Sequence, residues 1–254
     1  MSEARETPQT IQQRKGCESI AALTAYDFPM AKLLDAAGVP LVLVGDSLGM
    51  VVLGYPDTTH VTLDEMAHHT AAVARAMPSG LVVADLPYQS YETPEQAVTS
   101  AKCLVAAGAE GVKAEGGQAI LPQVEAIVAA GIPFLGHLGM LPQSVVEGGG
   151  YRIQGRDNEQ REALLADSQA LGQAGAFGIV LELVTPTVAA EITRLVHIPT
   201  IGIGSGDDCD GQILVTTDLW ATSPDYIPKH VQSNEAVRGK MERAIADWKK
   251  GMSN

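Results

Sequence analysis

One short motif recurs along this chain and constrains its fold more than any other feature. It consists of two small or polar residues followed by glycine, and it ends four helical patterns, each of which is followed within a few residues by an apolar run. The four copies are Ala36-Ala37-Gly38, Ala106-Ala107-Gly108, Ala129-Ala130-Gly131 and Gln173-Ala174-Gly175. Glycine just after a helix readily adopts the left-handed conformation that closes the last turn. The motif therefore predicts a chain in which helices and strands alternate.

Eight apolar runs are the strand candidates. Most of them contain Val, Ile and Leu without strict alternation, which is typical of parallel strands covered on both faces. They span residues 20–25, 40–45, 81–86, 111–115, 133–137, 178–183, 200–203 and 213–216.

Helix start signals stand between these runs. Thr62 and Glu65 have the spacing of a capping box, in which each side chain satisfies a free backbone donor. Thr93 precedes a proline at the first helical position, and Thr185 before Pro186 repeats this arrangement. Residues 234–250 are typical of a terminal helix.

Eight strand–helix units in 254 residues predict a (β/α)₈ TIM barrel, an architecture that needs roughly 250 residues. We expect one domain over residues 1–254, with a short polar N-terminal segment and a C-terminal helix. The alternative is a doubly wound sheet, which usually binds a nucleotide through a glycine-rich first loop. Here the first strand runs into Tyr26-Asp27-Phe28-Pro29 without glycine, and the glycines of residues 202–206 lack the GxGxxG spacing.

Charge and hydropathy exclude several classes of function. The chain has 17 basic and 30 acidic residues, a formal net charge of −13, which argues against binding to nucleic acid or to anionic lipid. No apolar run approaches the ~20 residues of a membrane helix. Residues 1–16 lack the apolar core of a signal peptide, so we expect a cytoplasmic protein. The cysteines at 17, 103 and 209 have no CxxC spacing, which argues against a zinc site.

Ionisable side chains follow five of the predicted strands. They are Asp46, Asp85, Glu115, His137 and Glu182. Each has an ordinary explanation when taken alone: an Asp can cap the next helix, a Glu can be solvated in a loop, and a His can be a satisfied core residue. The carboxyl ends of barrel strands share one rim, where active sites lie. Five such placements together therefore predict an enzyme active site.

These residue types favour metal-assisted chemistry on a 2-oxo acid. Asp46, Asp85 and Glu115 offer the oxygen ligands that Mg²⁺ prefers, and bound Mg²⁺ would polarise the substrate carbonyl and acidify the adjacent C–H bond. Lys113 lies on the same side of its strand as Glu115. It would neutralise a carboxylate or an enolate oxygen, unless it is a surface partner of a nearby Glu. Glu182 lies in an apolar run, so its pKa should be raised to suit a general base.

Several motifs, taken in order, resemble the ketopantoate hydroxymethyltransferase (3-methyl-2-oxobutanoate hydroxymethyltransferase) family. The resemblance extends from about residue 20 to about residue 231. The motifs occupy residues 45–50 (GDSLGM), 84–88 (ADLPY), 112–117 (VKAEGG), 136–139 (GHLG), 142–144 (PQS), 149–156 (GGYRIQGR), 198–204 (IPTIGIG) and 210–215 (DGQILV).

The resemblance implies a barrel of the phosphoenolpyruvate/pyruvate superfamily type with a defined set of roles. Mg²⁺ would be held by Asp46 and Asp85, with Glu115 reaching it directly or through water. The 2-oxo acid would contact Asp46, Ser47, Asp85 and Lys113, while Glu182 would accept the proton and His137 would lie near the metal pocket. The resemblance further implies 5,10-methylenetetrahydrofolate as the one-carbon donor. It also implies a homo-oligomer, often a decamer.

This sequence departs from the family pattern at several points. Leu183, Val184 and Thr185 alter the turn after Glu182, and Ala114 replaces a larger apolar residue. Residues 218–230 replace a glycine-rich turn, with Trp220 inserted, and the chain ends sooner than many members. Two alternatives follow: another Mg²⁺-enolate carbon–carbon bond enzyme, such as an aldolase or lyase, and a non-catalytic barrel. The chain lacks a Lys-Cys-Gly-His lid motif, which disfavours a lyase, and retention of the ionisable set disfavours a non-catalytic barrel.

Overall fold

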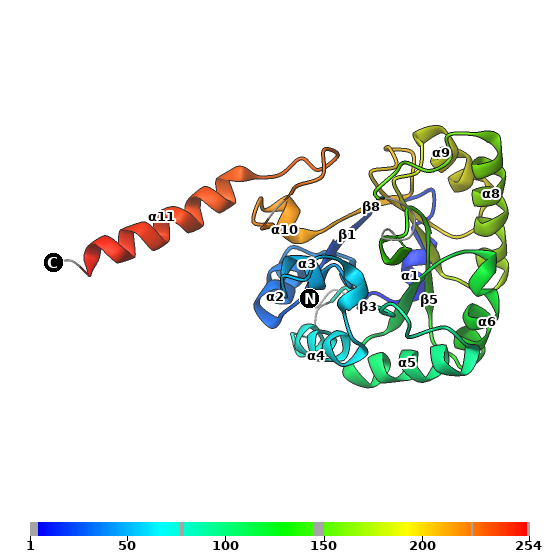
Figure 1. Ribbon diagram of the computed structural model, residues 1–254, viewed down its shortest axis with the longest axis horizontal. Helices are drawn as coiled ribbons and strands as arrows, with labels where there is room; N and C mark the ends of the chain where they lie inside the picture. The colour runs from blue at the N-terminus through cyan, green and yellow to red at the C-terminus, as the bar shows by residue number, and fades with distance from the viewer. Residues whose placement is uncertain (1–4, 77–78, 145–149, 225, 253–254) are drawn as a thin grey trace.

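A computed structural model describes residues 5–76, 79–144, 150–224 and 226–252. Within them, eight parallel strands close into a barrel, in which each strand pairs with the next and β8 pairs with β1 (Figure 1). The predicted (β/α)₈ barrel is therefore confirmed. The strands are β1 (Ile20–Thr24), β2 (Leu41–Val44), β3 (Leu81–Asp85), β4 (Gly111–Glu115), β5 (Phe134–Gly139), β6 (Gly178–Glu182), β7 (Thr200–Ile203) and β8 (Gly211–Leu214). Gly149, from one of the family motifs, lies outside the described residues.

Helices surround the barrel and connect most of its strands (Figure 1). The α-helices are α1 (Pro8–Gln13), α2 (Phe28–Ala36), α3 (Leu48–Val51), α4 (Leu63–Ala74), α5 (Pro94–Ala107), α6 (Leu121–Ala129), α8 (Asn158–Gln173), α9 (Pro186–Leu195), α10 (Thr216–Leu219) and α11 (Glu235–Gly251). Short 3₁₀ turns are η1 (Thr58–His60), η2 (Gln118–Ile120) and η3 (Pro142–Ser144).

The helix ends follow the sequence signals with one exception. The glycine of each of the four motif copies has a left-handed φ, between 70° and 114°. The side chains of Thr62 and Thr93 cap α4 and α5 as predicted. Thr185 occupies the cap position of α9 and Pro186 the first helical position as predicted, but the Thr185 side chain makes no capping hydrogen bond. Its hydroxyl instead donates to the backbone oxygen of Gly155 at 3.0 Å, which ties the preceding loop to the start of the helix.

Two strands, β5 and β8, differ from the prediction by two residues at a boundary, whereas the other six differ by one residue at most. β5 continues to Gly139, and β8 begins at Gly211 rather than at residue 213. A Cβ atom at position 211 would lie 2.2 Å from the backbone oxygen of Ile20. Glycine is present here because β8 and β1 approach closely, whereas in the sequence the Asp-Gly pair resembles a turn. The seven residues 204–210 join β7 to β8 as a loop, so this connection lacks the helix expected of a full strand–helix unit.

Side chains of the strands alternate between the barrel interior and the surrounding helices. In β3, Val82 and Ala84 belong to the apolar cluster shared with the helices, whereas Leu81 and Val83 belong to a second cluster inside the barrel. The other strands contribute Ile20, Ala22, Leu41, Leu43, Leu135, Val180, Ile201 and Ile213 to this interior cluster. Interior positions are therefore apolar over the amino-terminal part of the barrel.

The interior changes character towards the carboxyl ends of the strands. Asp85 is the next interior position after Val83, His137 follows Leu135, and Glu182 follows Val180. In β4 the interior positions are Lys113 and Glu115, both of which are buried. This two-residue period places an apolar layer at the amino-terminal end of the barrel and an ionisable layer at the carboxyl ends of the strands.

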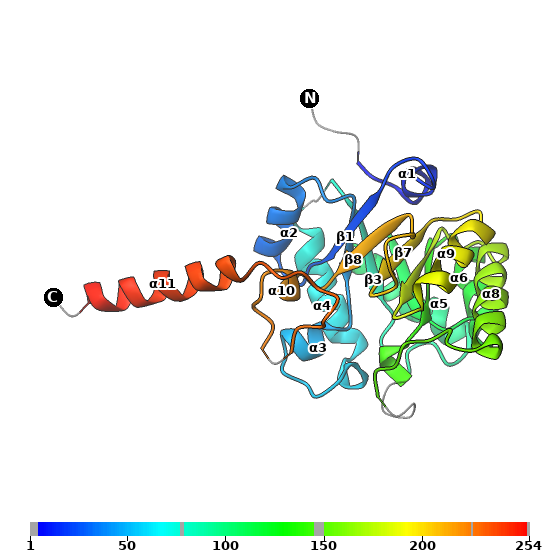
Figure 2. The same cartoon turned by 90° about the horizontal axis from the view of Figure 1, so that it is seen from above.

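The N-terminal segment closes the apolar end of the barrel. Ile11 of α1 is fully buried among the interior cluster. Lys15 fastens the segment, because its Nζ lies 2.8 Å from Asp210 Oδ2 and also donates to the backbone oxygen of Thr193. Figure 2 shows α1 at one end of the barrel and α3 at the opposite end. Water is thereby kept away from the floor of the ionisable layer.

The last helix does not pack on the barrel. α11 extends away from it in both views (Figures 1 and 2), and none of its residues is buried. One side of the helix is apolar, with Met241, Ile245, Trp248 and Met252 each more than half exposed. In the part of the chain that the structure describes, no helix is long and apolar enough to cross a membrane.

Replacing Ile11 with Ala tests the role of α1 as a plug. We expect the free energy of unfolding to fall by about 2–5 kcal/mol, the range for removing a large buried aliphatic side chain that leaves a cavity. Denaturant titration followed by circular dichroism measures it. Leu195→Ala, at a 43% exposed position, is the matched control and should change the value by less than about 0.5 kcal/mol. An Ile11 variant as stable as the control would contradict this role.

Candidate active site

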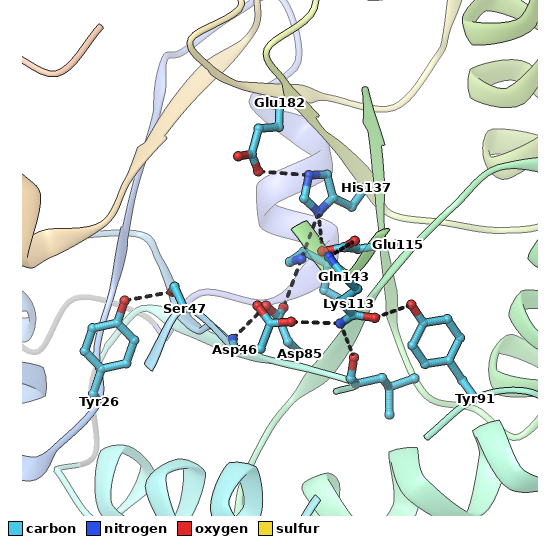
Figure 3. Close-up of polar contacts among 11 residues, drawn as sticks. Tyr26, Asp46, Ser47, Asp85, Tyr91, Lys113, Glu115, His137, Gln143 and Glu182 are labelled. Atoms are coloured by element: carbon cyan, nitrogen blue, oxygen red, sulfur yellow. Dashed lines mark hydrogen bonds and ion pairs between the residues drawn. The ribbon is translucent and has the colours of Figure 1, made fainter. Parts of the chain in front are cut away.

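A cavity of about 600 Å³ opens at the carboxyl ends of the strands. All seven residues that the sequence singled out line it: Asp46, Ser47, Asp85, Lys113, Glu115, His137 and Glu182. They come from β3, β4, β5, β6 and the loop after β2, and Figure 3 shows them converging. The expectation that these strand ends share one rim is therefore confirmed, while the chemical role of each residue stays a prediction.

Asp46 and Asp85 form an acidic pair. The backbone N–H of Asp46 donates to Asp85 Oδ2 at 3.1 Å, and both residues are buried. Burial and, after it, repulsion by Asp85 raise the pKa of Asp46 to about 7. A neighbouring cation would stabilise the ionised form of these two adjacent buried carboxylates.

Lys113 supplies part of that charge. It pairs in register with Asp85, and its Nζ lies 3.2 Å from Asp85 Oδ1. Burial alone would lower the Lys113 pKa. The combined attraction of Asp85, Glu115 and Asp46 outweighs this effect and raises that pKa above its ordinary value. Lys113 is thus held as a cation, and its surface ion-pair interpretation is wrong, because the residue is 4% exposed.

Glu115 lies beside this pair and is held by the loop after β5. Its Oε2 accepts a hydrogen bond from the backbone N–H of Gln143 at 3.0 Å. Burial, followed by repulsion from Asp46, raises the pKa of Glu115 well above its ordinary value. The Glu115 carboxylate is therefore one more buried acid whose ionised form needs a neighbouring cation.

The donor set fits a divalent cation of the Mg²⁺ type. Four buried or half-buried carboxylates lie around Lys113, and within the described residues no second Lys or Arg forms an ion pair with them. In the same part of the chain, Asp85 Oδ1 is buried with its ion pair to Lys113 but without a hydrogen bond. No group of three or more His, Cys, Asp or Glu side chains in that part of the chain could hold an ion. The fit is therefore to an ion that takes one or two carboxylates and completes its shell with water and substrate oxygens, as Mg²⁺ does.

His137 connects the lysine to Glu182. Lys113 Nζ donates to His137 Nδ1 at 3.1 Å, so the ring proton resides on Nε2. That Nε2 lies 3.2 Å from Glu182 Oε2 (Figure 3), although the two atoms are not aligned as a hydrogen bond. Burial, together with the charge of Lys113, lowers the pKa of His137 well below its ordinary value. His137 is thus a neutral imidazole that presents an N–H to the Glu182 carboxylate.

Glu182 is the most accessible acid of the set. Its side chain is 17% exposed, against 3% for the side chains of Glu115 and His137. Burial raises its pKa to about 7, as the apolar sequence around it predicted. A carboxylate with this pKa that faces the cavity is suited to remove a proton near neutral pH.

The altered turn after Glu182 is conformationally unusual. Leu183 has φ of 47°, in the left-handed region that bulky residues rarely adopt. Two backbone hydrogen bonds hold it there, from Leu183 N–H to the oxygen of Ile203 at 2.9 Å and from Gln154 N–H to the oxygen of Leu183 at 2.8 Å. The turn directly after Glu182 is therefore tied to β7 on one side and to the segment near Gln154 on the other.

Sequence reasoning did not single out several other polar residues of the site. Gln143 bonds to the acidic set, and the buried Tyr26 shares a 2.9 Å hydrogen bond with Ser47. Asp218 and His230, from the divergent segment 218–230, also line the cavity. Gln143 belongs to a motif that resembles the family, and this was its only signal, because it lies in a loop without periodicity.

Solved structures with this fold are enzymes with several different activities. A phosphonopyruvate hydrolase, solved with oxalate and Mg²⁺, matches with a TM-score of 0.65 and 14% identity over 97% of this chain and 88% of its own. A putative phosphonomutase from Burkholderia cenocepacia has a TM-score of 0.67 and 16% identity over 96% of this chain and 100% of its own. A 2,3-dimethylmalate lyase, a PEP mutase/isocitrate lyase superfamily member, has a TM-score of 0.60 and 16% identity, covering 82% of this chain and 80% of its own. At these identities the likeness shows the fold alone.

Sequence relatives are more specific. The 3-methyl-2-oxobutanoate hydroxymethyltransferase of Moorella thermoacetica is 52% identical over 89% of this chain and 84% of its own. The protein of the same name from Ignicoccus hospitalis is 49% identical over 95% of this chain and 93% of its own. The family model for ketopantoate hydroxymethyltransferase matches residues 5–254. With the acidic pair, the lysine and the facing carboxylate all in place, the chain belongs to the ketopantoate hydroxymethyltransferase family.

Proposed function

We propose that this protein transfers a hydroxymethyl group from 5,10-methylenetetrahydrofolate to 3-methyl-2-oxobutanoate. The product is 2-dehydropantoate (ketopantoate), a precursor of pantothenate and coenzyme A. Family membership supports the reaction. The observation that carries it is the position of Glu182, whose carboxylate faces the same cavity as Asp46, Asp85 and Lys113 and has a pKa of about 7.

Asp46 and Asp85 are the proposed ligands of Mg²⁺, with Glu115 reaching the ion directly or through water. When bound, the ion supplies positive charge that polarises the carbonyl of a 2-oxo acid and makes its C3 proton more acidic. Asp85 Oδ1 supports this assignment, because within the described residues it is buried with an ion pair to Lys113 as its charged contact and without a hydrogen bond. So does the raised pKa of Asp46, because a cation would favour its ionised form.

Lys113 and Ser47 are the proposed contacts of the 2-oxo acid, together with the acidic pair. Lys113 remains charged in the site and neutralises negative charge on the substrate oxygens. The Ser47 hydroxyl is oriented by its hydrogen bond with Tyr26, whose pKa is raised by burial so that its phenol stays protonated. These groups bind and orient the substrate before proton removal.

Glu182 is the proposed proton acceptor. Its carboxylate takes the proton from C3 of the substrate, and the Nε2 atom of His137 lies 3.2 Å from that carboxylate. The resulting C3 carbanion, delocalised as an enolate, forms a bond to the methylene carbon of the donor. The two C–N bonds of the methylene bridge break, and water supplies the hydroxyl group to this carbon. The two nitrogen atoms of the donor gain the proton held by Glu182 and one proton from the water, and tetrahydrofolate leaves. No oxidation or reduction occurs in this sequence.

The size of the cavity supports a second, larger substrate. At about 600 Å³ it is much larger than a 2-oxo acid of eight heavy atoms requires. Beyond the ionisable layer it is lined by residues of the segment 218–230, including Asp218, Tyr226 and His230. We propose that the folate donor occupies this part, which is where the sequence departs from the family pattern.

The proposed reaction can be followed by proton NMR in D₂O with 3-methyl-2-oxobutanoate, Mg²⁺ and 5,10-methylenetetrahydrofolate. We expect ketopantoate to form and EDTA to abolish its formation. Loss of the C3 proton signal without ketopantoate would instead favour another carbon–carbon bond enzyme, such as an aldolase, on a 2-oxo acid. No metal-dependent change would contradict the proposal and favour a non-catalytic barrel.

Replacing Glu182 with Gln tests the proton acceptor. We expect exchange of the C3 proton for deuterium to fall by at least about 10²-fold, because an amide cannot accept the proton. NMR in D₂O measures the exchange, and calorimetry should show nearly unchanged Mg²⁺ binding. Glu191→Gln, which removes a carboxylate that pairs with Arg161 outside the cavity, is the control and should exchange normally. Exchange at the wild-type rate in the Glu182 variant would refute the role.

The pH dependence of this exchange follows from the same carboxylate. The base acts in its ionised form, and its pKa is about 7. At saturating Mg²⁺ the rate should therefore rise with pH through about 7 and level off above it, with a value about 5-fold lower at pH 6 than at pH 7. A rate that stays constant from pH 5.5 to 8 would be inconsistent with a base of this pKa.

We also propose that the protein is a homo-oligomer in the cytoplasm; the decamer implied by the family resemblance stays a prediction. The supporting observation is α11, which carries its apolar side away from its own barrel. The barrel also carries exposed apolar side chains, since Phe28 and Leu33 of α2 are 44% and 60% exposed. Because α11 extends away from its own barrel, another copy of the chain is the proposed occupant of its apolar side.

Replacing Trp248 with Asp tests this contact. We expect the variant to have a smaller molar mass than the wild type in multi-angle light scattering, because a charge would be buried against an apolar surface. Lys250→Asp introduces the same side chain on the other side of α11 and should leave the mass unchanged. A monomeric wild type, or a Trp248 variant that assembles normally, would contradict the proposed interface.

A further inference from the structure

Gln143 uses its side-chain amide and its backbone N–H to bond four different groups around the acidic set. Its Nε2 donates to Asp46 Oδ2 at 2.8 Å and to the backbone oxygen of Leu86 at 3.0 Å. Its Oε1 accepts from the hydroxyl of Tyr91 at 2.6 Å. Its backbone N–H donates to Glu115 Oε2 at 3.0 Å. Gln143 is 4% exposed, so this arrangement is removed from water (Figure 3).

The orientation of the Gln143 amide is fixed by its neighbours. A flipped amide would place its oxygen against the Asp46 carboxylate and the Leu86 carbonyl, both of which are acceptors. These two groups therefore determine which side of the amide faces Asp46. The Tyr91 hydroxyl holds the amide from its other side by donating to Oε1.

The same bonds divide the oxygens of the acidic set in two. One oxygen of each carboxylate is held by the protein: Asp46 Oδ2 by the Gln143 side chain, Glu115 Oε2 by the Gln143 backbone, and Asp85 Oδ2 by the backbone of Asp46. Among the described residues, no hydrogen bond engages Asp46 Oδ1, and Asp85 Oδ1 has its ion pair with Lys113 Nζ at 3.2 Å but no hydrogen bond. The arrangement leaves Asp46 Oδ1 available to a cation, while Asp85 Oδ1 faces the Lys113 ammonium.

We propose that Gln143, held by its hydrogen bond from Tyr91, is a positioning residue for the Mg²⁺ ligands. It holds Asp46 by one oxygen and connects Asp46 to Glu115, so that the carboxylates are arranged before the ion binds. This inference rests on the proposed Mg²⁺ site. Hydrogen-bonding partners of metal ligands orient those ligands, and their loss typically lowers metal affinity by about 10–100-fold.

The choice of variant follows from the surroundings of Gln143. Gln143 and Glu115 also line a second cavity of about 290 Å³, together with Tyr88 and Tyr91. Truncation to Ala would enlarge the space beside Asp46 and admit water. Gln143→Leu is preferred because it keeps most of the side-chain volume while removing every side-chain hydrogen bond. Tyr91→Phe removes only the hydroxyl that donates to the amide oxygen.

The test titrates the intact protein with Mn²⁺, as a probe of the Mg²⁺ site, in the presence of 3-methyl-2-oxobutanoate. Free Mn²⁺ is measured by electron paramagnetic resonance. We expect the dissociation constant to rise at least about 10-fold in Gln143→Leu and about 2- to 10-fold in Tyr91→Phe, the effect of one hydrogen bond. Tyr88→Phe makes the same chemical change in the same second cavity, away from the amide, and should bind like the wild type.

The outcomes separate this inference from the proposed function. Wild-type affinity in both Gln143→Leu and Tyr91→Phe would overturn the inference while leaving the Mg²⁺ site intact. A wild-type protein that shows no saturable Mn²⁺ binding would overturn the metal site itself, and with it this role. A melting temperature that falls in Gln143→Leu without any change in Mn²⁺ affinity would show that Gln143 only stabilises the loop, and would overturn the inference too.

Discussion

The structure depends on how the barrel interior is filled. Every second side chain of a strand points inward, and these positions are apolar from Leu81 to Val83 and ionisable at Asp85. The apolar part, closed by Ile11, excludes water from beneath the ionisable part. Carboxylates placed on such a floor lose hydration on one side. Their ionisation then depends on neighbouring charges, hydrogen bonds and ligands.

This shared constraint has different consequences for different acids. Burial raises the pKa of both Asp46 and Glu182 to about 7. Asp46 lies beside Asp85 and receives a hydrogen bond from Gln143, so its ionised form suits a cation. Glu182 stands apart from that pair, faces the open cavity, and has the neutral His137 beside it. Asp46 and Glu182 thus have similar pKa values but different neighbours. For this reason we propose metal binding for Asp46 and proton removal for Glu182.

Loops at the carboxyl ends of the strands contribute side chains that hold the strand-end residues in place. Gln143 comes from the turn after β5, yet it bonds to Asp46 after β2 and to Glu115 of β4. Leu183 keeps its unusual backbone because β7 and the segment near Gln154 both bond to it. Neither residue gains this conformation from its own sequence neighbours, so both are held by tertiary contacts. The site is therefore a property of several strand ends and loops at once.

The sequence alone determined the architecture and the main ionisable residues. Apolar runs and glycine-terminated helices are local patterns, so they predicted the eight strands, and strand-end positions predicted Asp46, Asp85, Glu115, His137 and Glu182. Tertiary structure alone decided the start of β8, where close packing against Ile20 requires Gly211. It also decided the partner of Thr185, the direction of α11, and the contacts of Gln143, Tyr26 and His230. Those contacts join residues far apart in the chain, and no local pattern specifies which distant groups a loop side chain will meet.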